Sequence, residues 1–252
     1  MTSWRSASRQ SVSPVEQRAA ANVKAMILAA GRGERMRPLT DRVPKPLIEA
    51  AGRPLIVHLI ERLARAGFTD LVVNVSHLAG MVERGLGDGS RYGVHIAYSR
   101  EEQALETGGG IAYALPLLGN EPFVAINSDI YCDFDFTRLL SVAAALGSGT
   151  ACAHLVMVDN PPHHPEGDFS LSGGKLSEAG PRRLTFSGIG AYAPGLFAGV
   201  TRGAKCQLVA LLKPAMAQGA VSGEHHTGLW MDIGTPQRLA ALEQKLESGR
   251  AG

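Results

Sequence analysis

Short apolar runs alternate with helix-length segments from residue 24 to about residue 146, and this alternation constrains the fold more than any other feature. The first run, KAMILAA at 24–30, is followed by a glycine, as is typical of a parallel strand buried on both faces. The pattern predicts an open, doubly wound α/β sheet with helices on both faces. Further strands are expected at 71–75, 94–98 and 123–127, and helices at 54–66, up to 86, from the end of the TGGG segment (107–110) to 118, and at 136–146.

After residue 150 the pattern changes to shorter strands, expected at 151–158, 169–171, 184–192 and near 230–233, with helices at 207–218 and 235–247. Thr235-Pro236 indicates the start of the last helix, because the threonine hydroxyl can cap it and the proline ring presets φ. No repeat and no long linker divides the chain. The sequence therefore predicts one Rossmann-like α/β domain over 23–248, with a mixed sheet flanked by helices. Residues 1–22 are expected to be a disordered extension, although their Arg-rich, acid-poor composition would also suit a transit peptide.

Composition excludes several classes of function. The net charge of +2 over 252 residues gives no case for a basic face that binds nucleic acid. No apolar segment approaches the ~20 residues that a membrane helix needs. Cys132, Cys152 and Cys206 form no C-x-x-C pair, which is typical of reduced thiols in a cytosolic protein. We therefore expect a cytoplasmic protein without nucleic-acid or membrane partners, as a monomer or small homo-oligomer.

A segment rich in glycine and arginine, AAGRGERMRPLT at 29–40, follows the first strand. Ligands of open α/β sheets bind beyond the carboxyl ends of the strands, where glycines let backbone N–H groups approach a phosphate and arginines neutralise it. The spacing is not that of a dinucleotide fingerprint, whose third glycine would fall at Met36, nor that of a P-loop. A solvated basic loop is the alternative. However, Lys45 lies between Pro44 and Pro46, which stiffen the backbone around that charge.

Two aspartates far apart in the sequence are each expected at the end of a strand. They are Asp129 in NSD (127–129) and Asp232 in WMDIGT (230–235). Mg²⁺ is a hard cation that takes oxygen ligands and keeps substrate phosphates among them. A turn or capping role is the commoner one for a single aspartate. Together with the glycine- and arginine-rich segment, the pair predicts a Mg²⁺ site at Asp129 and Asp232.

LAAGRGERMRPLT followed by PKPL resembles the signature of sugar-1-phosphate nucleotidyltransferases, and the resemblance extends from Val23 to about Glu247. These enzymes join a nucleoside triphosphate to a sugar 1-phosphate and release pyrophosphate, on a nucleotide-diphospho-sugar transferase fold with Mg²⁺ as cofactor. The resemblance implies catalytic roles for Arg35, Lys45 and Asp129, and metal ligation by Asp129 and Asp232. It also implies nucleotide contacts from Ala30, Gly31, Gly33, Glu34, Arg35, Lys45 and Gly109, and substrate contacts from Glu106, Asn127 and Asp168.

The chain departs from the pattern of this family at two points. Ser128 stands where the family usually has glycine, which would narrow the pocket or restrict the backbone. The E-K-P segment that usually brings a lysine to the sugar phosphate is absent, and a second Mg²⁺ could take its place. A turn role after Gly167 is the alternative for Asp168. The pairs His163-His164 and His225-His226 lack the ligand set of a zinc site and are expected to be loop or pocket-edge residues.

Several segments resemble one branch of the family, the N-acetylmuramate-1-phosphate uridylyltransferases. They are LETGGG at 105–110, VDNP at 158–161, GDF at 167–169, FSGI at 186–189 and SGEH at 222–225. The resemblance implies transfer of a uridylyl group from UTP to N-acetylmuramate 1-phosphate, in peptidoglycan recycling. Mannose-1-phosphate guanylyltransferases, which typically have G-T-A-G where this chain has E-T-G-G, and glucose-1-phosphate nucleotidyltransferases are the alternatives. A catalytically silent sugar-nucleotide sensor would be expected to lose Arg35, Lys45, Asp129 or Asp232, all of which are present.

Overall fold

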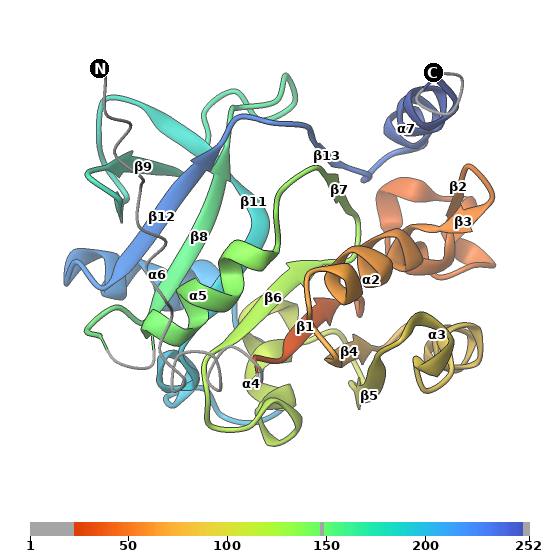
Figure 1. Ribbon diagram of the computed structural model, residues 1–252, viewed down its shortest axis with the longest axis horizontal. Helices are drawn as coiled ribbons and strands as arrows, with labels where there is room; N and C mark the ends of the chain where they lie inside the picture. Colours follow the sequence, from red (N-terminus) through yellow and green to blue (C-terminus); the bar gives the residue numbers. More distant parts are fainter. Residues whose placement is uncertain (1–22, 147–148, 249–252) are drawn as a thin grey trace, which may run out of the picture.

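A mixed sheet of nine strands, in the order β5-β4-β1-β6-β11-β8-β12-β10-β9, runs through the molecule (Figure 1). The computed structural model describes residues 23–146 and 149–248, and the extension expected at 1–22 lies outside them. The first four strands of this order are parallel, as the alternation of strands and helices predicts. They are β5 (His95–Arg100), β4 (Asp70–Val75), β1 (Ala25–Leu28) and β6 (Phe123–Asn127).

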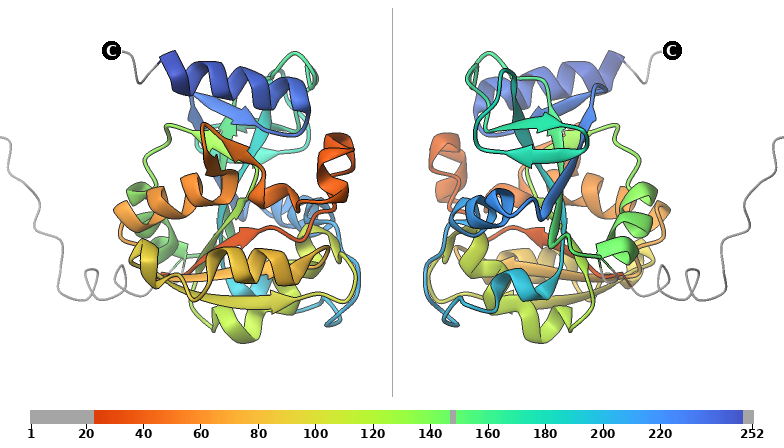
Figure 2. Two further views of the ribbon diagram at one scale, coloured as in Figure 1. Left: turned by 90° about the vertical axis from the view of Figure 1, so that its right-hand side faces the viewer. Right: turned by 90° about the vertical axis from the view of Figure 1, so that its left-hand side faces the viewer.

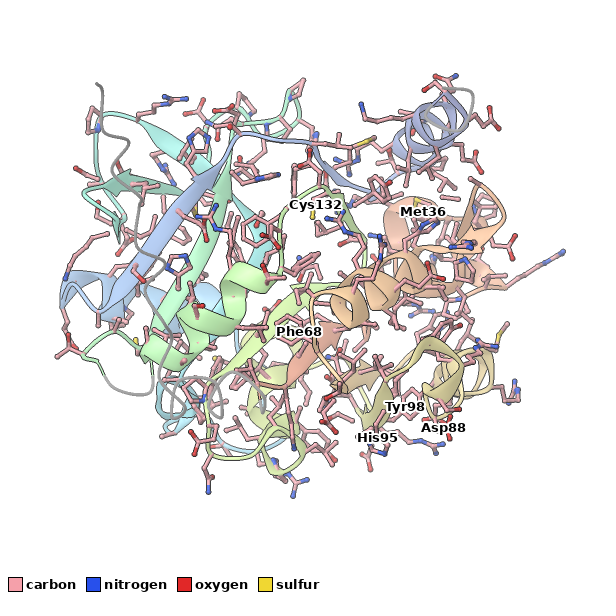
Figure 3. The ribbon with its side chains drawn as sticks, viewed as in Figure 1. Met36, Phe68, Asp88, His95, Tyr98 and Cys132 are labelled. Atoms are coloured by element: carbon pink, nitrogen blue, oxygen red, sulfur yellow. The ribbon has the colours of Figure 1, made fainter. Side chains whose placement is uncertain are left out.

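Helices cover both faces of these parallel strands (Figure 2). Neighbouring residues of one strand join different apolar clusters, because side chains alternate across a strand. Ile27 packs with α2 (Leu55–Arg65), α3 (Ala79–Leu86) and α5 (Thr137–Leu146), in the cluster that also contains the buried Phe68 (Figure 3). Met26 packs with α4 (Glu106–Leu118) and α6 (Leu208–Ala217) on the other face. The sheet is therefore doubly wound, as expected.

The other half of the sheet curls until β11 (Arg183–Tyr192) pairs with three strands, β6, β8 (Ala153–Val158) and β9 (Phe169–Ser172). β12 (Val221–His226) and β10 (Lys175–Ser177) lie between β8 and β9. The register of β11 against β8 shifts between Phe186 and Ile189. Gly188 lies in this bulge with a φ of +78°, and a Cβ there would lie 2.6 Å from Nδ2 of Asn127. The bulge therefore leaves room for Asn127 at the end of β6.

The C-terminal helix packs against the segment that follows β1. β13 (Trp230–Asp232) pairs antiparallel with β7 (Ile130–Cys132), and α7 (Pro236–Ser248) comes directly after it. A third apolar cluster joins residues of α7 to the segment after β1 and to the short hairpin of β2 (Glu49–Ala50) and β3 (Arg53–Pro54); its members include Met36, Ile48, Leu55, Leu239 and Leu242. Met36, labelled in Figure 3, is fully buried there. None of the helices described is long and apolar enough to cross a membrane.

The helix after the TGGG segment begins earlier than the sequence predicts. α4 starts at Glu106 and includes all of TGGG, although each glycine lowers helix stability by about 1 kcal/mol relative to alanine. Tertiary packing explains the difference. The backbone N–H of Gly109 donates to the carbonyl oxygen of Cys206 at 3.0 Å, and a Cβ on Gly109 would overlap the carbonyl oxygen of Ala204. The glycines let the helix approach residues 204–206.

We expect Gly109→Ala to lower the free energy of unfolding, because the added methyl group would overlap backbone that cannot move like a side chain. Overpacking of this kind costs about 1–3 kcal/mol, which lowers the melting temperature by roughly 2–4 °C per kcal/mol in a chain of this size. Thermal unfolding followed by circular dichroism measures the change. Gly195→Ala is the matched control, because no atom lies within 4 Å of a Cβ built there. Equal melting temperatures for the two variants would contradict this account.

Candidate active site

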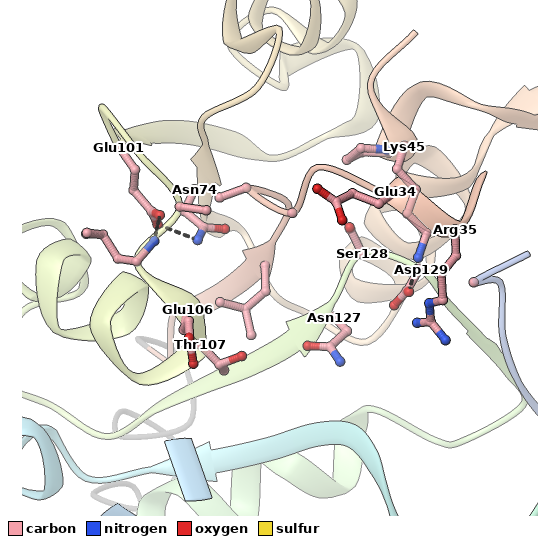
Figure 4. A pocket seen from close by; sticks show the side chains of 18 residues that line it. Glu34, Arg35, Lys45, Asn74, Glu101, Glu106, Thr107, Asn127, Ser128 and Asp129 are labelled. Carbon is pink, nitrogen blue, oxygen red and sulfur yellow. Dashed lines mark hydrogen bonds and ion pairs between the residues drawn. The ribbon is translucent and has the colours of Figure 1, made fainter. Parts of the chain in front are cut away.

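Three adjoining cavities form a cleft at the carboxyl ends of the parallel strands. Their volumes are about 420, 450 and 360 Å³, and Asn127 lines all three. The first cavity, shown in Figure 4, lies between the segment after β1 and the start of α4. Arg35 and Asp129 line both the first and the third cavity. The cleft therefore lies where an open α/β sheet is expected to bind its ligand.

The segment after β1 forms a tight wall of the first cavity. Ala30, Gly31, Gly33, Glu34 and Arg35 all line it, and a 3₁₀ helix runs from Glu34 to Met36. Gly33 has a φ of +67°, and a Cβ there would lie 2.9 Å from Cγ2 of Thr40 and 3.0 Å from Cβ of Lys45. By contrast, nothing lies within 4 Å of a Cβ built on Gly31. One glycine is thus needed for close packing, and the other leaves open space beside the backbone.

Lys45 and Asp129 form an ion pair in the first cavity (Figure 4). Their side chains are 13% and 20% exposed, so the pair is partly desolvated but open to a ligand. Lys45 begins a 3₁₀ helix that runs to Leu47. Asp129 follows β6, whose end is held because the N–H of Ser128 donates to the carbonyl oxygen of Leu28 at 3.1 Å. Ser128 is buried, and its φ is not in the left-handed region, so a glycine is not required at this position.

Asp232 lies beside Asp129 through the pairing of β13 with β7. The backbone N–H of Ile233 donates to the carbonyl oxygen of Asp129 at 2.8 Å, and both aspartates line the third cavity. Oδ1 of Asp232 lies 3.1 Å from Nη1 of Arg238 and 3.2 Å from Nε2 of His163. The two aspartates predicted at strand ends are therefore brought together, although about 100 residues separate them in the sequence.

The second cavity is lined in equal parts by apolar and polar side chains, and the polar ones include Glu106, Asn127 and Asp168. Oδ2 of Asp168 accepts a hydrogen bond from the backbone N–H of Phe186 at 2.7 Å, and its Oδ1 lies 3.1 Å from Nε2 of His164. Asp168 thus connects its loop to β11 and also faces the cleft. Glu106 has a φ of +61°, and non-glycine residues held in this region cost about 1–3 kcal/mol and cluster at functional sites.

Gly109 and one of the two histidine pairs lie outside the cleft. Gly109 lines none of the three cavities and instead packs against residues 204–206. His163 and His164 line the third cavity, as pocket-edge residues do. His225 and His226 do not line the cleft, and the expectation for this pair is wrong. They lie in β12, where their Nε2 atoms are 3.2 Å from Asp159 and 2.9 Å from Asp133.

A buried pair that the sequence analysis does not identify, Asn74 and Glu101, lines the first cavity (Figure 4). Nδ2 of Asn74 donates to Oε1 of Glu101 at 2.7 Å, and Oδ1 of Asn74 accepts from the N–H of Ala29 at 2.7 Å. The N–H of Leu105 donates to Oε2 of Glu101 at 3.0 Å. The pair therefore joins the end of β1 to the start of α4. Asn74 lies near the end of the apolar strand β4, and Glu101 follows β5 in the polar run SREEQ at 99–103, so only the topology of the sheet shows that they meet.

Burial raises the pKa of Glu101, although the hydrogen bonds from Asn74 and Leu105 act in the opposite direction. The folded state therefore favours the protonated carboxyl, and this contribution to stability is complete below the unfolded pKa of about 4.3. It is lost as the pH rises through the folded-state pKa. We expect the free energy of unfolding of Glu101→Gln, relative to that of the unsubstituted protein, to increase as the pH rises above about 4. Urea unfolding at several pH values measures this difference. A flat profile for Glu101→Gln would contradict the raised pKa.

Comparison with known proteins places this cleft in a family. The family model described as nucleotidyl transferase matches residues 24–165. The chain is 53% identical over 221 residues to the N-acetylmuramate alpha-1-phosphate uridylyltransferase of Neisseria meningitidis serogroup B, with 86% of this chain and 95% of that protein covered. A protein of the same name from Caulobacter vibrioides is 39% identical, with 88% and 96% covered. The solved structure of HddC from Yersinia pseudotuberculosis, complexed with GMP-PN, has the same fold, with a TM-score of 0.72 at 19% identity over 89% of this chain and 99% of that one. The chain therefore belongs to the nucleotidyl transferase family and has the fold of its sugar-phosphate nucleotidyltransferases.

Proposed function

We propose that the protein transfers a uridylyl group from UTP to N-acetylmuramate 1-phosphate, giving UDP-N-acetylmuramate and pyrophosphate. The observation that carries this proposal is the convergence of Arg35, Lys45, Asp129 and Asp232 on two adjoining cavities. Cations and carboxylates in one cleft suit a reaction between two phosphate esters. The names of the two relatives supply the sugar and the base, because a polar cleft by itself is compatible with several sugar phosphates.

The two aspartates fit a Mg²⁺ ion. Asp129 and Asp232 line the same cavity with hard oxygen ligands. No group of three or more His, Cys, Asp or Glu side chains within 23–146 and 149–248 is arranged to hold a metal, so substrate phosphates would complete the coordination, as is common for this ion. When bound, Mg²⁺ supplies counter-charge to the phosphates. Lys45 and Arg238, each beside one of the carboxylates, hold them in place.

The other proposed roles of the site residues are to align the two substrates and to compensate the negative charge of their phosphates. Two like unit charges ~4 Å apart repel by ~4 kcal/mol at an effective dielectric constant near 20, so the two phosphates need cations between them. Arg35 and Lys45 line one cavity, and we propose that they compensate charge on the α-phosphate and on the departing pyrophosphate. The attacking oxygen of the sugar phosphate is already ionised, so no general base is needed. We therefore propose that catalysis here rests on positioning.

The second cavity is the proposed site for the sugar. Asn127 and Asp168 face it with polar atoms, and Phe169, Phe186 and Leu212 supply apolar surface. This combination suits a sugar that carries both hydroxyl and methyl groups, as N-acetylmuramate does. UTP and sugar phosphates are charged metabolites that do not cross membranes. We therefore propose that the reaction takes place in the cytoplasm. We also propose that the protein is a monomer or a small homo-oligomer.

A panel of substrates tests the proposal. Pyrophosphate release is measured for four nucleoside triphosphates, each with the 1-phosphates of N-acetylmuramate, N-acetylglucosamine, mannose and glucose. The highest kcat/KM is expected for UTP with N-acetylmuramate 1-phosphate. Highest activity with GTP and mannose 1-phosphate, or with glucose 1-phosphate, would overturn the choice of substrates in favour of the corresponding nucleotidyltransferase. Tight binding of a sugar nucleotide without turnover of any pair would instead identify a silent sensor.

A further inference from the structure

Two guanidinium groups from opposite ends of the chain converge at Gly234. Arg35 follows β1, and Arg238 lies in the first turn of α7. A Cβ built on Gly234 would lie 3.1 Å from Nη2 of Arg35 and would overlap Nη2 of Arg238. Because both Nη2 atoms surround the same point, the two groups are close neighbours. Glycine at position 234 is what leaves room for them.

Arg238 is only partly satisfied by its neighbours. Its Nη1 donates to Oδ1 of Asp232 at 3.1 Å and lies 2.6 Å from Nε2 of His163. A guanidinium has donors but no acceptor, so Nε2 of His163 must accept this bond. The side chain of Arg238 is 19% exposed, and its Nε is buried without a hydrogen-bond partner. Arg238 therefore has one donor, Nε, without a partner, while another part of its side chain remains accessible.

Arg35 adds a second cation that its surroundings do not neutralise. Among the described residues it has no hydrogen bond or ion pair, and its side chain lines both the first and the third cavity. Figure 4 shows its guanidinium beside Asp129, at the edge of the cleft. Asp129 already pairs with Lys45, and Asp232 with Arg238. Two neighbouring guanidinium groups repel each other, and an anion between them would offset this repulsion.

We propose that Arg35 and Arg238 together form an oxyanion site at Gly234, which binds a phosphate group. Guanidinium forks match phosphate oxygens in geometry as well as in charge. Gly234 lines the first cavity and Asp232 the third, so the site lies where the two cavities meet. Arg238 thereby becomes a phosphate-binding residue in addition to Arg35 and Lys45. That the phosphate belongs to a substrate rests on the proposed function, whereas the oxyanion site itself does not.

A simpler role for Arg238 would be to hold Asp232 in place and nothing more. The two roles differ in one measurable respect. An anchor for Asp232 affects anion binding only through a metal ion, whereas a phosphate-binding residue affects it directly. Binding measured without metal therefore separates them.

Isothermal titration of the full chain in EDTA, with inorganic pyrophosphate in one arm and glucose 1-phosphate in the other, tests the proposal. Arg238→Met is expected to weaken binding of at least one anion by about 10- to 100-fold, and Lys245→Met, at an exposed position of the same helix, should leave both unchanged. Loss confined to pyrophosphate would assign the site to the nucleotide, and loss confined to glucose 1-phosphate would assign it to the sugar phosphate.

Binding of both anions by Arg238→Met with the affinity of the unsubstituted protein would overturn the proposal, as would failure of the unsubstituted protein to bind either. If Arg238→Met does not fold, Gly234→Ala provides the second test, because its methyl group would displace both guanidinium groups. Circular dichroism checks the folding of each variant. Arginine-dependent binding of pyrophosphate together with no activity in the substrate panel would reject the proposed function and retain the oxyanion site.

Discussion

Asp129→Asn is expected to lower kcat by at least about 1000-fold while the fold stays intact. Asparagine has the size of aspartate but lacks the charge that both Lys45 and the proposed Mg²⁺ require. The backbone contacts around position 129 do not involve the carboxylate: the carbonyl oxygen accepts from Ile233, and Ser128 donates to Leu28. The substitution therefore removes a ligand without removing a support of the sheet.

Pyrophosphate release at several Mg²⁺ concentrations measures this effect, and circular dichroism checks the fold. Asp133→Asn is the matched control. Asp133 lies only four residues further along the chain but contacts His226, outside the cleft. Its kcat should equal that of the unsubstituted protein. Unchanged turnover in Asp129→Asn would rule out Asp129 as a metal ligand.

Lys45→Met is expected to lower kcat by about 100- to 1000-fold with a smaller change in KM. Methionine retains most of the aliphatic stem but removes the charge proposed to compensate the developing negative charge of the phosphates. Cβ of Lys45 packs against Gly33, so the stem is needed for the wall of the cavity and only the ammonium group is tested. Steady-state kinetics with both substrates varied separates kcat from KM.

Lys245→Met again serves as the control, at an exposed position far along the chain. The double variant with Asp129→Asn should lose less activity than the two single losses combined, because contacting residues are coupled. Full activity in Lys45→Met would favour the alternative in which residues 29–46 form a solvated basic loop.

The parallel half of the fold could be predicted because its signals are local. The apolar runs at β1, β4 and β6 are buried on both faces, and α2 shows apolar residues at helical spacing with Gly67 just after its end. In the other half of the sheet, the strands predicted at 151–158, 169–171 and 184–192 are found as β8, β9 and β11, but β10 and β12 are not predicted. β12 reads VSGEHH, and several of its polar side chains contact residues distant in the sequence, as Glu224 does with Arg138. A pattern of hydrophobicity cannot identify a strand that is held in this way.

The residues of the candidate site also fall into two groups: some are indicated by a local sequence pattern, and others are brought together only by the fold. Residues 30–45 lie close together in the sequence, so their composition suffices to indicate a phosphate site. Asn74, Glu101 and Arg238 carry no spacing signal. The sheet order brings Asn74 and Glu101 to the first cavity, and the packing of α7 brings Arg238 to Asp232. Gly109 illustrates a further limit. Sequence alone does not distinguish a glycine that lets a ligand approach from one that lets a helix approach another segment, and here the carbonyl oxygen of Ala204 occupies that space.

The packing of β13 and α7 against the segment after β1 has a consequence for synthesis on the ribosome. The parallel strands can form while translation is still in progress, but Asp232 and Arg238 arrive only with the last part of the chain. A nascent chain therefore carries Arg35, Lys45 and Asp129, but neither Asp232 nor Arg238, until residues 230–248 have left the exit tunnel. The oxyanion site proposed at Gly234 therefore cannot form before residues 234–238 have been synthesised.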